Sequence, residues 1–173
     1  MKQSKAPCET RQPHPALPAE CLSFRAATPD DTAFLFEVYA GTRMDELDAV
    51  AWDENQKLAF FKMQFDARQR QYREVYRHAD CSIILKDDQP IGTILVDRND
   101  REIRLVDISI LPEHRNAGVG TQLVVKLLED ATVAALPVNL HVLKTSDAVR
   151  FYERLGFSNI EEDGAYLKMI WAD

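Results

Sequence analysis

The sequence has few cysteines and no recognisable metal-binding pattern. Only three cysteines occur in 173 residues, at Cys8, Cys21 and Cys81, and none of them forms a C-x-x-C pair. An odd, scattered set argues against a disulfide framework or a zinc site and for reduced thiols, as in the cytoplasm. The four histidines are dispersed as well. We therefore expect no metal site.

Long hydrophobic runs and an excess of basic residues are also missing. No stretch approaches the roughly 18 consecutive apolar residues of a membrane span, so a soluble, cytoplasmic protein without a membrane partner is expected. The 21 basic and 28 acidic residues give a formal net charge of -7, which offers no basic surface for nucleic acid. This charge favours a cationic or amine substrate over an anionic one, although acidity for solubility alone is the commoner cause.

The first 21 residues differ in composition from the rest of the chain. They show no apolar periodicity and lack the apolar core of a secretory signal, and they contain Pro7, Pro13, Pro15 and Pro18. This pattern predicts an extended or disordered leader over residues 1–21. Residues 22–173 are enough for one compact domain and leave little for a second.

Glycine is scarce, with six residues, yet two of them stand in one short segment, Arg115-Asn116-Ala117-Gly118-Val119-Gly120-Thr121. An apolar, β-branched run over residues 103–111 precedes this segment and ends at Pro112. Leu123, Val124, Leu127, Leu128 and Ala131 follow it with helical spacing. The glycines are therefore predicted at a strand-to-helix junction.

Such a junction can hold an anion, because the first N–H groups of a helix have no intrahelical partner and the helix dipole is positive there. A dinucleotide fingerprint would need a third glycine where Leu123 stands. A P-loop would need Gly-Lys-Ser/Thr where the chain has Gly120-Thr121-Gln122. The segment thus predicts a different phosphate-bearing cofactor. A tight turn that only requires positive φ at the glycines is the alternative.

The remaining periodicities predict an α/β or α+β fold around a mixed, twisted sheet. Thr28, Pro29 and Asp31 form a helix start with a weak capping box. A longer helix is expected to carry Leu58, Phe61, Phe65, Tyr72 and Val75 on one stripe. The expected elements are helices over about 29–42 and 53–77, strands over 81–86 and 91–97 joined by a turn at 87–90, a strand over 103–111, and then a helix, a strand, a helix and two closing strands.

The motifs together resemble the Gcn5-related N-acetyltransferase (GNAT) superfamily. Its signature Q/R-x-x-G-x-G/A is matched by Arg115, Gly118 and Gly120, and its later strand and F-Y-E-x-L-G-F helix are matched by residues 140–143 and 148–157. Phe24 to Asp31 is similar to the family's first strand and helix entry. The resemblance covers about residues 22–171. It implies a mostly antiparallel twisted sheet flanked by helices on both faces, with acetyl-CoA as co-substrate.

The resemblance also implies where the cofactor would bind. Its pantetheine arm would pair with the main chain of Ile108, Ser109 and Ile110, and its pyrophosphate would lie on Asn116, Ala117, Gly118, Val119, Gly120 and Thr121. Arg115 would contact a phosphate or only tie down the loop. Many members carry an asparagine before the later helix, where this chain has Thr145-Ser146-Asp147. Ser146 is therefore a cofactor contact with fewer hydrogen bonds to offer.

Two residues are candidates for catalysis. The resemblance makes Tyr152 the acid that protonates the departing thiolate, a role that suits a phenol with a pKa of about 10. Its helical spacing with Ala148, Phe151 and Leu155 also fits a core aromatic. Asp107, an acid within an apolar strand, is the candidate base because burial would raise its pKa. A structural partnership with an arginine such as Arg104, a water relay, and Glu102 as the base are its alternatives.

The expected function is transfer of an acetyl group from acetyl-CoA to a primary amine of a small molecule or peptide by direct attack. A non-catalytic acetyl-CoA sensor or interaction module is the alternative, and a longer acyl donor and a homodimer are left open. Residues that could line the acceptor pocket, or belong to the core, are Tyr39, Arg43, Glu46, Trp52, Phe60 and Phe61.

Overall fold

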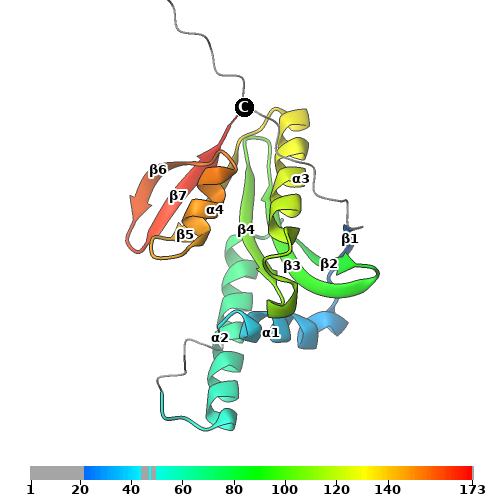
Figure 1. The fold of residues 1–173 in the computed structure, drawn as a ribbon, viewed down its shortest axis with the longest axis vertical. Helices are drawn as coiled ribbons and strands as arrows, with labels where there is room; N and C mark the ends of the chain where they lie inside the picture. Colours follow the sequence, from blue (N-terminus) through cyan, green and yellow to red (C-terminus); the bar gives the residue numbers. More distant parts are fainter. Residues whose placement is uncertain (1–21, 44–46, 48–49, 173) are drawn as a thin grey trace, which may run out of the picture.

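Seven strands form one sheet in the order β1-β2-β3-β4-β5-β7-β6 (Figure 1). The computed structural model describes residues 22–43, 47 and 50–172, so the predicted leader, with Cys8 and Cys21, lies outside the described residues. β4 and β5 pair in parallel, and all other neighbours are antiparallel, as expected. The strands are β1 (Leu22–Ala26), β2 (Asp80–Lys86), β3 (Gln89–Arg98), β4 (Ile103–Ile110), β5 (Val138–Leu143), β6 (Ser158–Asp163) and β7 (Tyr166–Trp171).

Helices cover both faces of this sheet, which confirms the predicted layers. α3 (Val119–Ala134) and α4 (Ala148–Arg154) lie on one face, and α1 (Thr32–Gly41) and α2 (Glu54–Val75) lie on the other (Figure 1). A short 3-10 turn, Pro29–Asp31, leads into α1. The Asp31 carboxylate accepts hydrogen bonds from the Thr28 N–H at 2.7 Å and from both Arg25 Nη atoms at 2.7 and 2.8 Å. These bonds, those of Arg25 foremost, hold the pKa of Asp31 well below its usual range.

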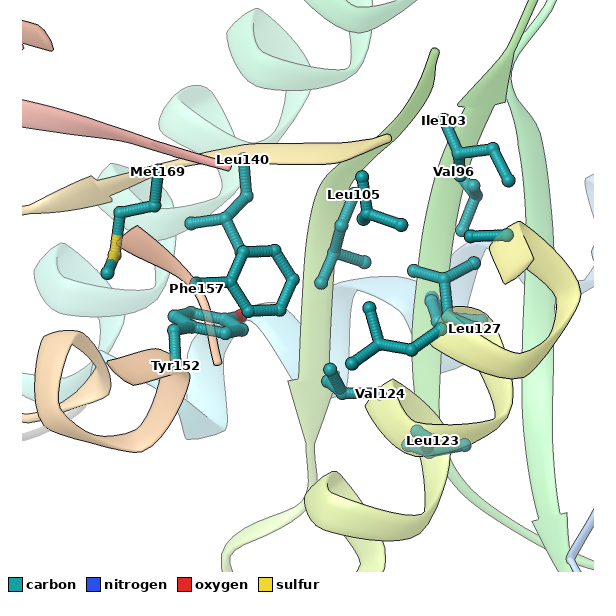
Figure 2. Close-up of a cluster of buried hydrophobic side chains, with 14 of the residues drawn as sticks. Val96, Ile103, Leu105, Leu123, Val124, Leu127, Leu140, Tyr152, Phe157 and Met169 are labelled. Carbon is teal, nitrogen blue, oxygen red and sulfur yellow. The ribbon is translucent and has the colours of Figure 1, made fainter. Parts of the chain in front are cut away.

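The main hydrophobic core lies between the sheet and the helices α3 and α4. Figure 2 shows Leu123, Val124 and Leu127 of α3 facing the strand residues Val96, Ile103 and Leu105. Each buried aliphatic side chain of this kind contributes roughly 1.5–3 kcal/mol from the burial of apolar surface. This core fixes β4, the central strand, against α3.

A second, smaller cluster joins α1 to α2 through Tyr39, Leu47, Phe61 and Phe65. The predicted stripe on α2 is therefore right for its two phenylalanines. It is wrong for Leu58 and Val75, which are 54% and 60% exposed. Leu58 lies in the second turn of α2 and Val75 is its last residue.

The β2–β3 hairpin turns on two residues, not on the four expected. Asp87 and Asp88 have φ of 50° and 63°, as a two-residue type I′ turn requires, and Gln89 already pairs with Lys86. Pro90 belongs to β3 and pairs with Leu85. The composition predicts the turn correctly, but its length follows from the strand pairing.

A β-bulge in β4 is the feature of the fold that shapes the site. Val96 pairs with Leu105 and the adjacent Leu95 pairs with Asp107, so Val106 is an extra residue. An extra residue shifts the alternation of side chains by one. Ile103 and Leu105 face the main core before the bulge, whereas Asp107 faces α2 after it.

β4 and β5 separate soon after they begin to pair. Their parallel ladder consists of Ile103, Arg104 and Leu105 against Val138, Asn139 and Leu140. From Val106 onward β4 continues without this neighbour, and the two strands diverge, as Figure 1 shows. The divergence opens the sheet next to the glycine segment.

Candidate active site

A cleft of about 830 Å³ lies where β4 and β5 diverge. Ten of the residues predicted to form the site line it: Ile108, Ser109, Ile110, Arg115, Asn116, Gly118, Gly120, Thr121, Ser146 and Tyr152. They come from β4, the loop before α3, the start of α3 and the segment leading into α4. The two predicted sets, one around the glycines and one around the later helix, are thus brought together.

The β4 wall of the cleft offers main-chain groups. The Leu111 N–H donates to the Ile91 carbonyl of β3, and groups of successive residues in a strand point to alternate sides. Ile108 and Ile110 therefore direct their N–H and carbonyl groups away from β3, into the opening. Ser109 directs its own toward its partner Thr93, so only its side chain reaches the cleft. The main-chain role expected for Ser109 does not fit this register.

The glycine segment has the conformation that a helix N-terminal anion site needs. Asn116 and Gly118 have φ of 59° and 81°, which asparagine and glycine tolerate best. Gly118 is the N-cap of α3, its carbonyl accepts from the Gln122 N–H, and it has no side chain with which to cap the first N–H groups. Gly120 needs no positive φ. The positive-φ alternative therefore explains Gly118 but not Gly120.

The Arg115 side chain donates two hydrogen bonds to main-chain carbonyls of the protein. Its Nε donates to the Ile110 carbonyl at 2.8 Å and its Nη2 to the Gly41 carbonyl at 3.1 Å, which ties the loop to the end of β4 and to α1. The guanidinium still lines the cleft, together with His114 and Arg154. The cleft thus has a cationic wall suited to an anion. Sequence reasoning missed Arg154, which lies within the F-Y-E-R-L-G-F motif.

Ser146 stands at the entry to α4. Its hydroxyl oxygen accepts a hydrogen bond from the Ala148 N–H at 3.2 Å, the first N–H of α4, although the N-cap position itself is Asp147. The side chain also lines the cleft. Its contact with a cofactor stays a prediction.

Tyr152 belongs to both the core and the cleft. It is 7% exposed, and its ring packs edge-on against Phe151 and Phe157 at centroid distances of 5.0 and 5.5 Å. In Figure 2 its oxygen end turns toward β4. The hydroxyl has no hydrogen-bond partner among the described residues, although a buried tyrosine hydroxyl usually has one. Burial, and then the charge of Asp107, raise its pKa, so the phenol remains protonated at neutral pH.

A second cavity, of about 150 Å³, lies under α2 and meets the cleft at Ser109, which lines both. We name it the acceptor cavity after the role proposed for it below. Residues from α1, α2, β2, β3 and β4 form it: Leu35, Val38, Tyr39, Phe65, Arg68, Gln69, Tyr72, Arg73, Tyr76, Ala79, Cys81, Thr93, Ile94, Leu95, Asp107 and Ser109. Most of the walls are aromatic or aliphatic.

Asp107 is the only carboxylate among the described residues that line the acceptor cavity. One oxygen lies 2.5 Å from Arg68 Nη2, and the other accepts a hydrogen bond from the Ser109 hydroxyl at 3.2 Å. Burial raises the pKa of Asp107, and Arg68, Ser109 and Arg43 oppose this increase. The expected direction is therefore found. The arginine partner is Arg68 of α2, whereas Arg104 pairs with Glu102 and Asn139.

Arg68 is the main residue of the cavity that sequence reasoning missed. Its guanidinium lies 5.2 Å from the Tyr39 ring centroid and 5.0 Å from that of Tyr72, so two aromatic faces fix it beside Asp107. The available signal was a charged residue at position 68 between Phe65 and Tyr72, inside the predicted apolar stripe.

Several other predicted residues do not line the cleft, but the main-chain contacts expected of Ala117 and Val119 stay predictions. Val119 is 2% exposed with its side chain in the main core, and Ala117 is exposed outside the cleft. Of the expected acceptor-pocket residues, Tyr39 lines the cavity and Arg43 stacks on its ring at 5.0 Å. Phe60 and Phe61 pack in the α1–α2 cluster, Trp52 contacts Phe60, and Glu46 lies outside the described residues.

The comparisons with known proteins agree with this geometry. Residues 43–157 match the model of the acetyltransferase (GNAT) family. The chain belongs to the GNAT family. Among curated proteins no sequence matches it. The GNAT match includes the cleft from β4 to α4, together with α2 above the acceptor cavity.

Solved GNAT structures share the fold at low sequence identity. A PaiA N-acetyltransferase from Thermoplasma acidophilum, solved in complex with coenzyme A, is 15% identical with a TM-score of 0.67, over 88% of this chain and 99% of that one. An acetyltransferase from Thermus thermophilus is 16% identical with a TM-score of 0.64, over 88% and 97%. These likenesses establish the fold of the GNAT domain.

The described residues contain no group of three or more His, Cys, Asp or Glu side chains arranged to hold a metal ion. No described helix combines the length and apolar character needed to cross a bilayer.

Proposed function

We propose that this GNAT protein transfers an acetyl group from acetyl-CoA to a primary amine, in the cytoplasm. The observation that carries the proposal is the meeting of two cavities at Ser109, with Tyr152 lining one and Asp107 lining the other. A catalyst of group transfer must bring a donor and an acceptor together at one point with an acid and a base in reach.

The cleft fits coenzyme A in three respects. Ile108 and the N–H of Ile110 offer main-chain groups with which the amide-rich pantetheine arm could pair as a neighbouring strand would, while the Ile110 carbonyl already accepts from Arg115. The uncapped N-terminus of α3 at Gly118 suits the pyrophosphate. Arg115 and Arg154 add guanidinium groups to the wall. ATP or NAD would use the helix N-terminus but would leave the free edge of β4 unpaired.

The acceptor cavity supplies the base. An amine must lose a proton before its lone pair can attack a carbonyl carbon, and Asp107, whose pKa is raised by burial, is a stronger base than an exposed carboxylate. Arg68 and Ser109 hold its two oxygens in place. The proton of the attacking ammonium passes to Asp107, directly or through one water.

Tyr152 supplies the acid. When the amine nitrogen bonds to the acetyl carbon, the carbon–sulfur bond of the thioester breaks and a thiolate leaves. The Tyr152 hydroxyl lines the cleft without a partner in the described part of the chain and remains protonated, so it can donate its proton to that sulfur. The attacking nitrogen then loses a second proton, which restores the phenol of Tyr152, and the proton held by Asp107 passes to solvent. The products are the N-acetylated amine and free CoA.

Thermal unfolding with added acetyl-CoA, CoA, ATP or NAD tests the cofactor assignment. A ligand at 100 times its dissociation constant adds about 2.7 kcal/mol to stability, so both CoA species should raise the melting temperature while ATP and NAD should not. Thiol release in the presence of primary amines then tests transfer. Stabilisation without thiol release from any amine would support the acetyl-CoA sensor instead, and no stabilisation by CoA would refute both functions.

A further inference from the structure

The acceptor cavity has a charge opposite in sign to that of the whole chain. The chain carries a formal charge of -7, whereas the described residues of the cavity lining include one carboxylate, Asp107, and two guanidinium groups, Arg68 and Arg73. Asp107 and Arg68 neutralise each other as an ion pair. The cavity therefore presents one net positive charge, at Arg73, to whatever molecule enters it.

Arg73 has no acidic partner in the described part of the chain. Its one hydrogen bond there runs from Nε to the Gln69 carbonyl of its own helix, at 3.2 Å, which leaves both terminal nitrogens of the guanidinium available. A guanidinium with two available N–H edges matches the geometry of a carboxylate. Arg73 is therefore suited to bind an anionic group at the exposed rim of the cavity.

The position of Arg73 sets the spacing between the two charged ends. Arg68 contacts Asp107, so it lies beside that carboxylate along α2, and it precedes Arg73 by five residues on this helix. At a rise of 1.5 Å per residue, the two arginines are separated by about 7.5 Å along the helix axis. A molecule held at both Asp107 and Arg73 must therefore have its amine and its anion at opposite ends.

The walls between these ends are largely apolar. Phe65, Tyr72 and Tyr76 of α2 and its C-terminal end and Tyr39 of α1 contribute rings, and Leu95 and Ile94 contribute aliphatic surface. The volume of about 150 Å³ equals that of an apolar cavity that holds one benzene ring. The body of the acceptor must therefore be compact, and an aromatic ring fits it.

We propose that the acceptor is a small primary amine whose compact apolar or aromatic body ends in one carboxylate, and that Arg73 binds this carboxylate. The proposal rests on the acetyltransferase function above and names its substrate class. One carboxylate balances the one free positive charge, whereas a dianionic phosphate would leave a negative charge uncompensated. A polyamine would find no free carboxylate among the described lining residues, since Asp107 is already paired.

Two amines of equal size provide the test: 4-(aminomethyl)benzoate, and 4-(aminomethyl)benzamide, which replaces the carboxylate by a neutral amide. Spermidine is the cationic comparison. In thiol release from acetyl-CoA, kcat/KM for the benzoate should exceed that for the benzamide by about tenfold or more, which corresponds to about 1.4 kcal/mol. Spermidine should be the poorest acceptor of the three.

Substitution of Arg73 then assigns the effect to this residue. Arg73→Gln should raise KM for the benzoate and bring its kcat/KM to the level of the benzamide. Arg70→Gln is a matched control, because Arg70 is exposed on the same helix, donates from Nε to the carbonyl four residues before it, and does not line the cavity. The control should keep the preference for the benzoate.

The outcomes separate the substrate class from the function. Equal kcat/KM for benzoate and benzamide, a preference for spermidine, or a benzoate preference that survives Arg73→Gln would overturn the substrate class while thiol release upheld the acetyltransferase. Thermal stabilisation by acetyl-CoA without thiol release from any amine would overturn both.

Discussion

The cofactor cleft and the acceptor cavity meet at β4 but are built from different parts of the chain. The cleft uses main-chain groups of residues 108–121 and the N-terminus of α3, which are close in sequence. The acceptor cavity uses side chains from five elements, and its ion pair joins Arg68 to Asp107 across 39 positions. Side-chain substitutions should therefore affect the cavity strongly, while the cleft should respond mainly to changes in backbone conformation.

The largest expected effect tests the side-chain-built cavity. Asp107→Asn removes the proposed base and should lower kcat/KM by about 100-fold or more, since general base catalysis typically contributes 10²- to 10⁴-fold. Thermal stabilisation by acetyl-CoA should persist, because the cleft uses no Asp107 atom. Steady-state kinetics measure the fall in kcat/KM, and thermal unfolding measures the retained stabilisation by acetyl-CoA. Full activity with an unchanged pH profile would indicate a water relay without Asp107.

Tyr152 tests a place where the cleft depends on a side chain. Tyr152→Phe keeps the ring in its edge-on contacts with Phe151 and Phe157 and removes only the hydroxyl. We expect kcat to fall about tenfold or more with little change in CoA affinity or in melting temperature. An unchanged kcat would mean that Tyr152 is only a core aromatic.

The ion pair offers a test through pH. Burial raises the pKa of Asp107 and Arg68 opposes this, so Arg68→Gln should let the pKa rise further. Less of the base is then ionised at a given pH, and the acidic limb of the kcat/KM profile should move to higher pH. Arg104→Gln is the control, because Arg104 pairs with Glu102 and Asn139 instead. A uniform loss of activity at all pH values would limit Arg68 to a structural role.

The smallest expected effect concerns the backbone of the cleft. Gly118→Ala places a Cβ at a φ of 81°, which should reduce the free energy of unfolding by about 1 kcal/mol. Gly120→Ala needs no positive φ, and its Cβ would lie 3.6 Å from Phe151 and 3.9 Å from Ile110, at ordinary contact distances. Denaturant unfolding should show a much smaller loss for this variant. Equal losses would argue against a conformational requirement at Gly118.

The same division explains what could be predicted from the sequence. The Arg115–Thr121 segment, the strand before it and the helix after it are local patterns, and the structure places them as expected. The fold class follows from the order of such patterns. The α4 motif with Tyr152 likewise lies in the cleft.

Features that depend on strand register or tertiary contact could not be predicted. The bulge at Val106 turns Asp107 toward α2, and it depends on how β4 pairs with β3. The sequence of β4 is a nearly continuous apolar run without alternation, so it cannot show where the alternation of side chains shifts. In the sequence Arg68 only interrupts a helix stripe, and the packing of α2 on the sheet is needed to show its partner. The described lining of the cavity carries one net positive charge although the chain as a whole is acidic, because net charge averages over surfaces that the substrate never meets.

The bulge at Val106 makes β4 a strand with two independent sets of positions. Beyond it, Ile108 and Ile110 face the main core and direct their main chain to the cleft, while Asp107 and Ser109 face the acceptor cavity. Under the proposed function, neighbouring residues of β4 contact different molecules. The acceptor specificity should then be open to redesign at alternate positions of β4, and on the facing side of α2, while the groups proposed to bind the acyl donor stay unchanged.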